Sequence, residues 1–313
     1  MSYRLSGLLL LNLMTPAIYA DNFQYPLQAQ TVAPDTYVLE GKTEDFSKLN
    51  GGYIVNTAYI VTQDGVIVID TGASRRFGEQ QRAYIEKITG KKINRVYLTH
   101  HHPDHFLGNQ AYADVPIYAL PATQQGIQQQ GESFSDNMYR LIGDWMRDTK
   151  VTSPTQVAKA GKETVGGHEL ELLALQGHTP GDLAIFDHTT GVLFSGDLVF
   201  NNRAATTPNA NIQQWLSALD SLLRLPFKVL VPGHGNVSTD NAPIAQTRAY
   251  LEWLQSSLQQ AAAQGLDMTE VMQTPIPEQF KGVALAQHEL RRSVTHLYPA
   301  LETQQLKPAK QTP

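Results

Sequence analysis

The segment THHHPDH at residues 99–105 constrains this chain more than any other feature. It places four imidazoles and one carboxylate in six consecutive positions, directly after a short apolar strand. Neutral imidazole and carboxylate are common ligands of divalent metals. Because a loop can turn side chains two residues apart toward one point, we expect His100 and His102 to bind one ion while Asp104 and His105 face a second. A solvated polar turn is the alternative.

Three further polar segments favour the metal interpretation. They read GHTPGD at 177–182, SGD at 195–197 and PGHG at 232–235, and each follows an expected strand. Their glycines allow the backbone to turn tightly and bring the neighbouring histidine or aspartate inward. One such loop would be weak support, but three of them together with the histidine cluster indicate a metal site assembled from four separate loops.

Alternating and apolar patterns predict strands and helices in two successive halves. Residues 56–61 and 65–70 form an expected hairpin, and a helix is expected over 77–89, closed by Gly90. Further strands are expected over 96–98, 168–172, 183–186, 192–194 and 228–231, and a helix from Ile212 to a stop at Pro226. Strands come first in each half, which suggests two sheets with helices on their outer faces.

The two ends of the chain read differently from the rest. Residues 1–20 combine an early arginine, an apolar run and a small residue at Ala20, which is typical of a secretory signal peptide. A membrane anchor or a poorly ordered tail is the alternative. We expect a mature protein from about Asp21, periplasmic or secreted, with a single domain over 21–305 and a loose tail over 306–313.

Composition excludes several classes of function. The 313 residues are 42% hydrophobic and carry a net charge of −5, so nothing favours nucleic acid or an anionic membrane as a partner. The chain contains no cysteine, which excludes thiolate catalysis and cysteine-ligated metals. No later segment is apolar enough over eighteen residues to span a membrane. The expected partner is a small-molecule substrate, and a protein partner is unknown.

The motif His-x-His-x-Asp-His resembles the metallo-β-lactamase superfamily, and the resemblance runs from about residue 52 to 235. It implies an α+β fold, an αββα sandwich of two mixed sheets with helices on the outer faces. It also implies a glyoxalase II-like ligand set and a supporting aspartate behind it. By position in the motif, the resemblance implies that His100, His102 and His178 bind the first metal. It implies that Asp104, His105 and His234 bind the second. Asp197 then bridges both metals, and Asp70 supports the ligands.

Shorter segments around 56–57, 69–76 and 102–110 resemble exported zinc hydrolases of periplasmic quinoprotein systems and their sulfur-oxidation-linked relatives. One departure concerns the B1 β-lactamases, which have a cysteine at the position of Asp197 and a drug-binding lysine three residues later. Here that later position is Phe200, so efficient β-lactamase activity is not expected. Arg203 is a candidate for binding a substrate anion instead, with a plain surface charge as the alternative.

A predicted helix over 134–150, after a glutamine-rich segment at 124–130, carries an apolar face that includes Trp145. Core packing and a lid over the metals are both consistent with that face. Trp145 is therefore a second candidate substrate contact. The remaining histidines, His168, His188, His288 and His296, have no motif around them and are read as structural or exposed.

These features lead to one leading function and two alternatives. The leading one is a binuclear hydrolase in which a hydroxide shared by two metals, oriented by Asp104, attacks the carbonyl of an ester, thioester, lactone or amide. Zinc is the expected metal, with iron or manganese possible. The alternatives are a class B β-lactamase and a non-enzymatic, metal-binding accessory protein of a quinoprotein redox system.

Overall fold

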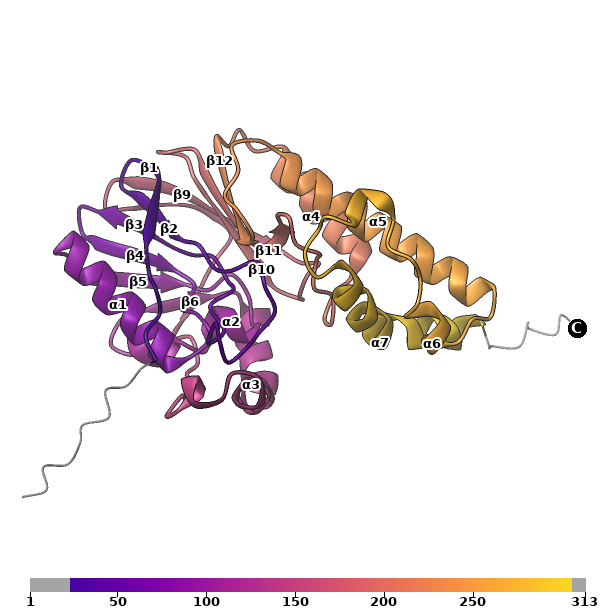
Figure 1. Ribbon diagram of the computed structural model, residues 1–313. Coiled ribbons are helices and arrows are strands. Elements are labelled where there is room, and N and C mark those ends of the chain that lie inside the picture. The colour runs from indigo at the N-terminus through magenta and orange to yellow at the C-terminus, as the bar shows by residue number, and fades with distance from the viewer. Residues whose placement is uncertain (1–22, 306–313) are drawn as a thin grey trace, which may run out of the picture.

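The computed structural model describes residues 23–305 (Figure 1). The expected signal peptide over 1–20 and the expected tail over 306–313 lie outside these residues. None of the helices in the described range is long and apolar enough to cross a membrane.

The described strands form two sheets, one ordered β1-β2-β3-β4-β5-β6-β7 and the other β12-β11-β10-β9-β8. The strands are β1 Ala29–Ala33, β2 Thr36–Leu39, β3 Thr57–Thr62, β4 Gly65–Ile69, β5 Ile93–Tyr97, β6 Ile117–Ala119, β7 Gln156–Val157, β8 Gly161–Val165, β9 His168–Leu175, β10 Asp182–Asp187, β11 Val192–Phe200 and β12 Val229–His234. Pairing from β1 to β4 is antiparallel and from β4 to β7 parallel. In the second sheet, β11 and β12 are parallel and the other pairs are antiparallel. Both sheets are therefore mixed, as expected.

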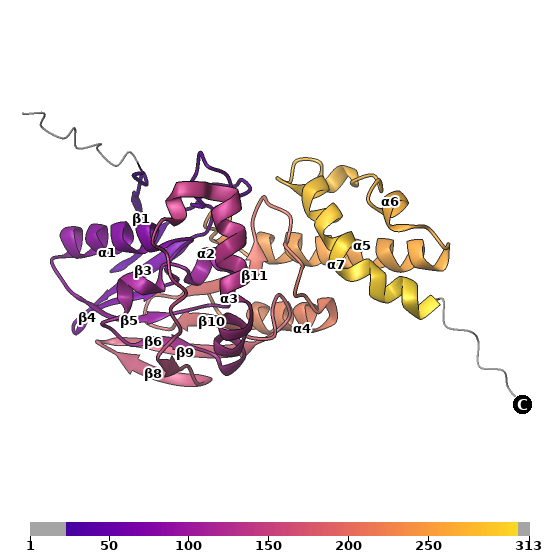
Figure 2. The same ribbon diagram turned by 90° about the horizontal axis from the view of Figure 1, so that it is seen from below.

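The helices pack outside the two sheets. They are α1 Arg75–Thr89, α2 Pro103–Phe106, α3 Pro121–Ile142, α4 Ile212–Leu223, α5 Ala242–Ala263, α6 Met268–Val271 and α7 Ala286–Gln305, with short 3-10 turns at Asn109–Tyr112, Gly143–Met146 and Glu278–Phe280. Figure 1 shows α1 and α3 beside the first sheet, and Figure 2 shows the group α4 to α7 at the other end of the molecule.

The period-two pattern of the strands separates three apolar layers. In β4, Val66 and Val68 join the core under α1 and α3, whereas Ile67 and Ile69 join the core between the sheets. The same alternation in β10 places Ala184 and Phe186 in the core under α4, α5 and α7 and Leu183 and Ile185 between the sheets. Because successive strand residues face opposite sides, each sheet buries both faces. The expected αββα sandwich is confirmed.

Helix ends depend on capping groups that the apolar pattern does not report. The Ser74 hydroxyl accepts a hydrogen bond from the Phe77 amide at 3.1 Å, so α1 begins at Arg75, two residues before its expected start. Gly90, in the left-handed region at φ 67°, ends it as expected. The glutamine-rich segment was expected to precede a helix over 134–150, and this boundary is wrong. Residues 124–130 lie inside α3, which ends at Ile142, because glutamine has good helix propensity.

Candidate active site

The polar ends of β4, β5, β9, β11 and β12 meet at one edge of the sandwich. Two backbone hydrogen bonds join the sheets there, from Leu183 to the Thr99 carbonyl at 2.7 Å and from Asn56 to the Gly233 carbonyl at 2.8 Å. The carboxyl ends of parallel strands lie at the same edge, so loops far apart in sequence converge there.

Four buried side chains form what we call the first ligand group: His100, His102, His178 and Asp197. One potential ligand atom from each lies within 4.8 Å of the other three. Nε2 of His178 is 2.8 Å from Nδ1 of His102 and 3.3 Å from Oδ2 of Asp197. Nε2 of His100 lies 3.8 Å from the same Oδ2. Three imidazole nitrogens and one carboxylate oxygen therefore surround one point.

Asp104, His105 and His234 form the second ligand group, with the same 4.8 Å limit. Oδ2 of Asp104 lies 3.3 Å from Nε2 of His234 and 3.8 Å from Nε2 of His105. Asp104 and His105 lie in the short helix α2, immediately after Pro103, so one turn directs both toward the same side.

Asp197 connects the two groups. Its Oδ1 lies 3.2 Å from Nε2 of His105, and its Oδ2 lies 3.3 Å from Nε2 of both His178 and His234. Asp197 lies inside β11 and His234 at the last position of β12, so the expectation of four loops is wrong for these two residues. The pairing of β11 with β12 is irregular at Gly196, whose φ is 50°, and this irregularity turns Asp197 toward the histidines.

The donor atoms of this site fit a pair of divalent cations. Among the described residues, His100 Nε2, His105 Nε2 and Asp197 Oδ1 are buried polar atoms that make no hydrogen bond, although the last two lie 3.2 Å apart. A buried polar atom without a partner costs free energy, so one that points at other ligand atoms indicates a missing partner between them. Imidazole and carboxylate together suit zinc and also iron or manganese.

Hydrogen bonds from outside the two groups hold the imidazoles in place. Oδ2 of Asp70 lies 2.7 Å from Nδ1 of His105, and the Ile54 carbonyl lies 2.8 Å from Nδ1 of His234. Asn209 Oδ1 lies 2.9 Å from Nε2 of His102. Such partners fix the orientation of a ligating ring. The role expected for Asp70 has this geometry, whereas sequence reasoning missed Asn209 and the Ile54 carbonyl, because no motif surrounds either residue.

Burial and charge divide the histidines into two kinds. Burial lowers the pKa of His100 and His102 well below 6.5 and lowers the pKa of His178 to about 3. Burial also acts against the charged form of His105, but the carboxylates of Asp197, Asp70 and Asp104 outweigh it and raise the pKa of His105 well above 6.5. Three imidazoles are thus neutral at neutral pH, each with one ring nitrogen that carries no proton, and His105 forms an ion pair with the carboxylates around it.

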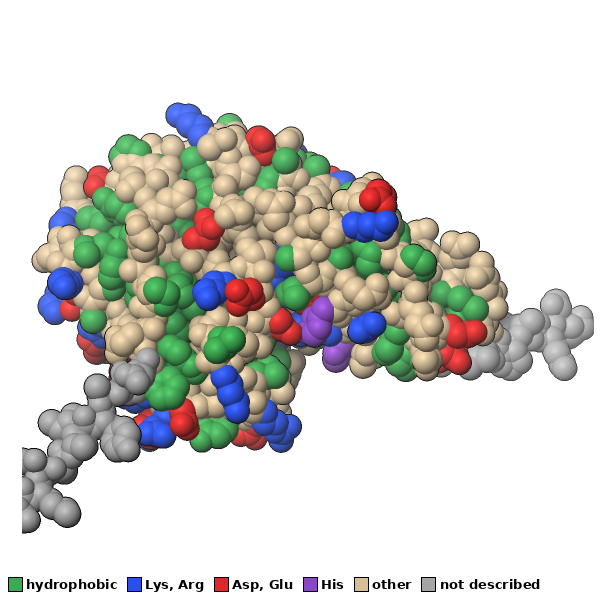
Figure 3. All heavy atoms as spheres, in the orientation of Figure 1, with side chains coloured by type: hydrophobic (Ala, Val, Ile, Leu, Met, Phe, Trp, Pro, Cys, Tyr) green, Lys and Arg blue, Asp and Glu red, His purple; other side chains and the backbone are tan. Residues whose placement is uncertain are grey.

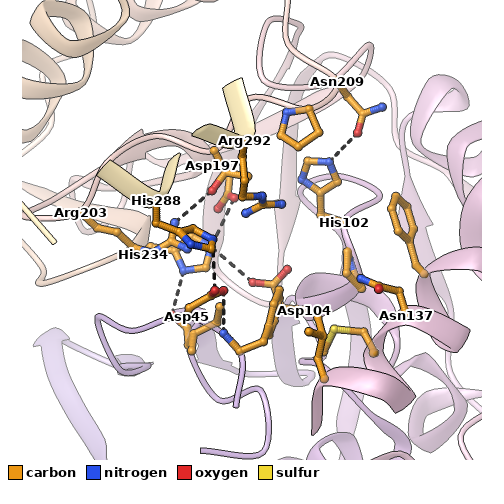
Figure 4. A pocket seen from close by; sticks show the side chains of 18 of the residues that line it. Asp45, His102, Asp104, Asn137, Asp197, Arg203, Asn209, His234, His288 and Arg292 are labelled. Atoms are coloured by element: carbon orange, nitrogen blue, oxygen red, sulfur yellow. Dashed lines mark hydrogen bonds and ion pairs between the residues drawn. The ribbon is translucent and has the colours of Figure 1, made fainter. Parts of the chain in front are cut away.

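A cavity of about 430 Å³ opens onto both ligand groups (Figure 4). His102, Asp104, Asp197 and His234 reach it from the ligand groups, and α3 and α7 supply opposite parts of its wall. Its other lining residues are Asp45, Phe46, Ile54, Pro103, Phe134, Asn137, Met138, Leu141, Arg203, Thr206, Pro208, Asn209, His288, Arg292 and His296. His288 and His296 are exposed, which is one of the two readings taken from sequence. Together with Arg292 of α7 they also line the cavity, and no motif indicated this.

Arg203 lines this cavity, but its guanidinium already has partners. Nη2 of Arg203 lies 3.4 Å from Oε1 of Glu289, and Nη1 donates to Thr206 Oγ1 at 3.1 Å. The side chain is only 2% exposed, so the alternative of a surface charge is wrong. Its charge is offset by a buried carboxylate, which leaves it a weak candidate for binding a substrate anion.

Trp145 lies away from the cavity over the ligand groups. Its Nε1 donates to the Lys48 carbonyl at 2.9 Å, and its ring packs against Phe23 and Tyr25. The expectation of a substrate contact is therefore corrected: this residue packs in the core beneath α3. The part of the apolar face that does reach the cavity is Met138 and Leu141.

The comparisons with known proteins agree with the site. A sequence model of the metallo-beta-lactamase superfamily matches residues 50–234, which is more than half of the chain. The chain belongs to the metallo-beta-lactamase superfamily. All seven residues of the two ligand groups lie within the matched range.

Curated superfamily relatives of this chain carry different activities in their names. It is 24% identical over 216 residues to a linear primary-alkylsulfatase of a Pseudomonas species, a match that covers 56% of this chain and 40% of that protein. It is 26% identical over 194 residues to the metallo-beta-lactamase IND-1 of Chryseobacterium indologenes, covering 58% and 72%. A hydroxyacylglutathione hydrolase of Bdellovibrio bacteriovorus is 23% identical over 184 residues, covering 56% and 61%.

Solved structures of the superfamily show the same fold. A metallo-beta-lactamase from Pontibacter korlensis is 21% identical, with a TM-score of 0.59 over 72% of this chain and 99% of that one. The metallo-beta-lactamase IND-7 gives a TM-score of 0.59 at 20% identity, over 72% and 98%. The superfamily match and the two buried ligand groups support a metal-dependent hydrolase.

Proposed function

We propose that this superfamily member is an exported hydrolase that loads two zinc ions and cleaves an ester, thioester, lactone or amide of a small molecule. The observation that carries the proposal is the position of Asp197, whose two carboxylate oxygens lie within 3.3 Å of histidines from both ligand groups. A carboxylate shared in this way supports two cations close together rather than one.

Two divalent cations would supply a deprotonated water near neutral pH and stabilise the negative charge that develops on the attacked oxygen. His100, His102 and His178, with Asp197, would hold one cation. Asp104, His105 and His234, again with Asp197, would hold the other. The low pKa of the first three histidines keeps one ring nitrogen of each free to bind a cation at neutral pH.

The residues around the cavity favour water as the nucleophile. The carboxylate of Asp104 faces the cavity, where it would accept a hydrogen bond from that water. Of the described residues that line the cavity, Thr206 alone carries a side-chain hydroxyl, and its Oγ1 donates to Glu289 at 3.0 Å. This hydroxyl lacks the adjacent histidine that would activate it.

Export is proposed from residues 1–20, whose pattern is that of a signal peptide. Mass spectrometry of the protein recovered from the periplasm or medium tests this directly. Cleavage near Ala20 would support export, and an uncleaved cytoplasmic chain would contradict it.

A class B β-lactamase is the second candidate, because the names of several fold neighbours point to it. One observation weighs against it. B1 enzymes have a drug-binding lysine at the position that Phe200 occupies in this chain. The ring of Phe200 is buried and stacks on His234, with the ring centroids 5.3 Å apart. A stacked phenyl ring offers no cation to a drug carboxylate.

The deciding experiment measures metal content together with turnover. Near two zinc per chain with hydrolysis of esters, thioesters or lactones would support the proposal. Fast hydrolysis of a chromogenic cephalosporin, about 10 per second or more, would favour the β-lactamase instead. Bound zinc without turnover on any substrate would favour the accessory protein, and a zinc-reconstituted chain that retains none would contradict all three.

Asp197→Asn provides the matched variant, with the exposed Asp64→Asn on the β3–β4 turn as its control. We expect Asp197→Asn to lower zinc content to one per chain or less and to lower kcat/KM by about 100-fold or more. Loss of a residue that only supports a ligand costs about 10- to 100-fold, and loss of a ligand should cost at least the upper value. Asp64→Asn is expected to change neither. Unchanged zinc content in Asp197→Asn would contradict the bridging role.

A further inference from the structure

Helix α7 lies outside the range matched to the superfamily yet forms one wall of the cavity. Its residues His288, Arg292 and His296 are spaced four apart, so they share one helix face, and all three line the cavity. Figure 4 shows His288 and Arg292 beside Asp197 and His234. In the space-filling view, histidine side chains reach the surface at the notch between the sandwich and the C-terminal helices, beside basic and acidic groups (Figure 3).

Arg203 and helix α7 together place two guanidinium groups beside a single carboxylate, that of Glu289. Glu289 is fully buried and lies between two guanidinium groups, 3.4 Å from Nη2 of Arg203 and 3.1 Å from Nη1 of Arg292. One carboxylate thus serves two arginines. The nearby Asp45 is engaged elsewhere, since its Oδ2 lies 3.2 Å from Nε2 of His288.

Arg292 is the arginine that faces the cavity with donors to spare. It is held in place by Glu289, which contacts only its Nη1, at 3.1 and 3.4 Å. Among the described residues, its Nη2 and Nε have no hydrogen-bond partner on the protein. Its side chain is 35% exposed, against 2% for Arg203, so a ligand in the cavity can reach it. A guanidinium fixed on one side with free N–H groups on the other suits an anionic oxygen group.

The opposite wall is apolar. Phe134, Met138 and Leu141 line it from α3, with Asn137 as its polar member. Phe46 and Pro208 add apolar surface to the cavity from two loops. A ligand that fills the cavity therefore meets apolar side chains along its body, a cation at α7 and the two ligand groups at the base. Pockets of this kind bind by apolar contact and orient the ligand with a few polar groups.

We propose that Arg292 anchors an anion subsite in this cavity, and that the substrate carries a carboxylate or sulfate group on an apolar body, separate from the bond that is cleaved. This inference rests on the proposed hydrolase function, because it assigns the cavity to the substrate. It also predicts that an anionic ligand binds without being hydrolysed, so it can be tested by binding alone.

The test compares 4-phenylbutyrate with its neutral amide, 4-phenylbutyramide, by calorimetric titration of the zinc-loaded protein. We expect the carboxylate to bind at least fivefold more tightly than the amide. Arg292→Ala should abolish this preference, and Arg292→Lys should retain part of it because it keeps the charge. Arg291→Ala is the matched control, since Arg291 is exposed and does not line the cavity.

Two outcomes would overturn the inference: equal affinity for both probes in the unaltered protein, or a preference that survives Arg292→Ala, which would mean that the metals hold the carboxylate. Glu289→Gln tests it in the opposite direction. Glutamine keeps an oxygen that can accept from Arg292 Nη1 and removes only the shared counter-charge. The change should therefore tighten binding of 4-phenylbutyrate and leave the amide unchanged, whereas weaker binding of the carboxylate would contradict the subsite. Zinc content measured on the same samples separates the two proposals, because a chain without zinc contradicts the hydrolase, and a zinc-loaded chain without the preference contradicts the subsite alone.

Discussion

The carboxylate of Asp70 lies 2.7 Å from Nδ1 of His105 and also accepts hydrogen bonds from the amide and the hydroxyl of Thr99, each at 2.8 Å. Thr99 immediately precedes the histidine cluster, so one buried carboxylate holds both the start of that loop and one of its imidazoles. Asp70 has a φ of 61°, a left-handed conformation that aspartate and asparagine adopt more readily than most residues.

This geometry predicts the effect of Asp70→Asn. Asparagine keeps the size and tolerates the backbone conformation, so the change removes mainly the negative charge beside His105. We expect zinc affinity of the second ligand group to fall by about 10- to 100-fold, measured by competition with a chelator. Asp64→Asn serves as the control, and affinity unchanged in Asp70→Asn would show that His105 is oriented without this contact.

Gly233→Ala is expected to disturb the site without altering any ligand. A Cβ at Gly233 would lie 1.9 Å from Oδ1 of Asp197, a distance that forces the carboxylate away from both ligand groups. We expect zinc content to fall below two per chain. Gly282→Ala is the control, because a Cβ there would meet nothing within 4 Å. Full zinc content in Gly233→Ala would mean that the carboxylate moves without cost.

Asn209→Ala tests the support of His102 from the cavity side. The substitution removes the oxygen that lies 2.9 Å from Nε2 of His102. We expect zinc affinity of the first ligand group to fall by about 10-fold, while Asn209→Asp, which keeps an acceptor oxygen, should retain most of it. Equal losses in both variants would point to a packing effect and not to the hydrogen bond.

Zinc binding to the metal-free protein should release protons mainly from the second ligand group. The pKa of His105 is raised by Asp197, Asp70 and Asp104 despite burial, so its imidazole is protonated at neutral pH and must lose that proton to bind a cation. The affinity of the second ligand group for zinc should therefore rise with pH, by up to tenfold per pH unit for the release of one proton. Binding of the first should change little above pH 6, because burial lowers the pKa of His178 to about 3.

Calorimetry in buffers of different ionisation enthalpy would count these protons. Release of about one proton with the second zinc, and of few with the first, is the expected result. The raised pKa of His105 also makes the stability of the metal-free protein depend on pH. A raised pKa of His105 stabilises the fold below pH 6.5, and this contribution is lost as the pH rises through the pKa of the folded state. Proton release shared equally by both zinc ions would contradict this division.

The local sequence was sufficient for the layered fold and for the residues of the ligand groups. The continuous apolar runs of β4 and β10 are typical of strands buried on both faces, and the crowding of imidazoles at 99–105 together with three further polar segments favours a bound cation over a solvated turn. Such signals are short-range: strand periodicity and residue chemistry are written within a few neighbouring positions.

The contacts between distant segments required the folded chain. The support of His102 by Asn209 and the contact of Trp145 with the Lys48 carbonyl depend on which surfaces pack together, and no local pattern carries that information. The two arginines beside the cavity are the clearest case. Arg203 and Arg292 lie 89 positions apart and share one buried carboxylate, Glu289, because helix α7 folds back over the cavity. A charged residue reads the same in sequence whether it faces water or a pocket, so tertiary packing alone settles which arginine is left free to meet a ligand.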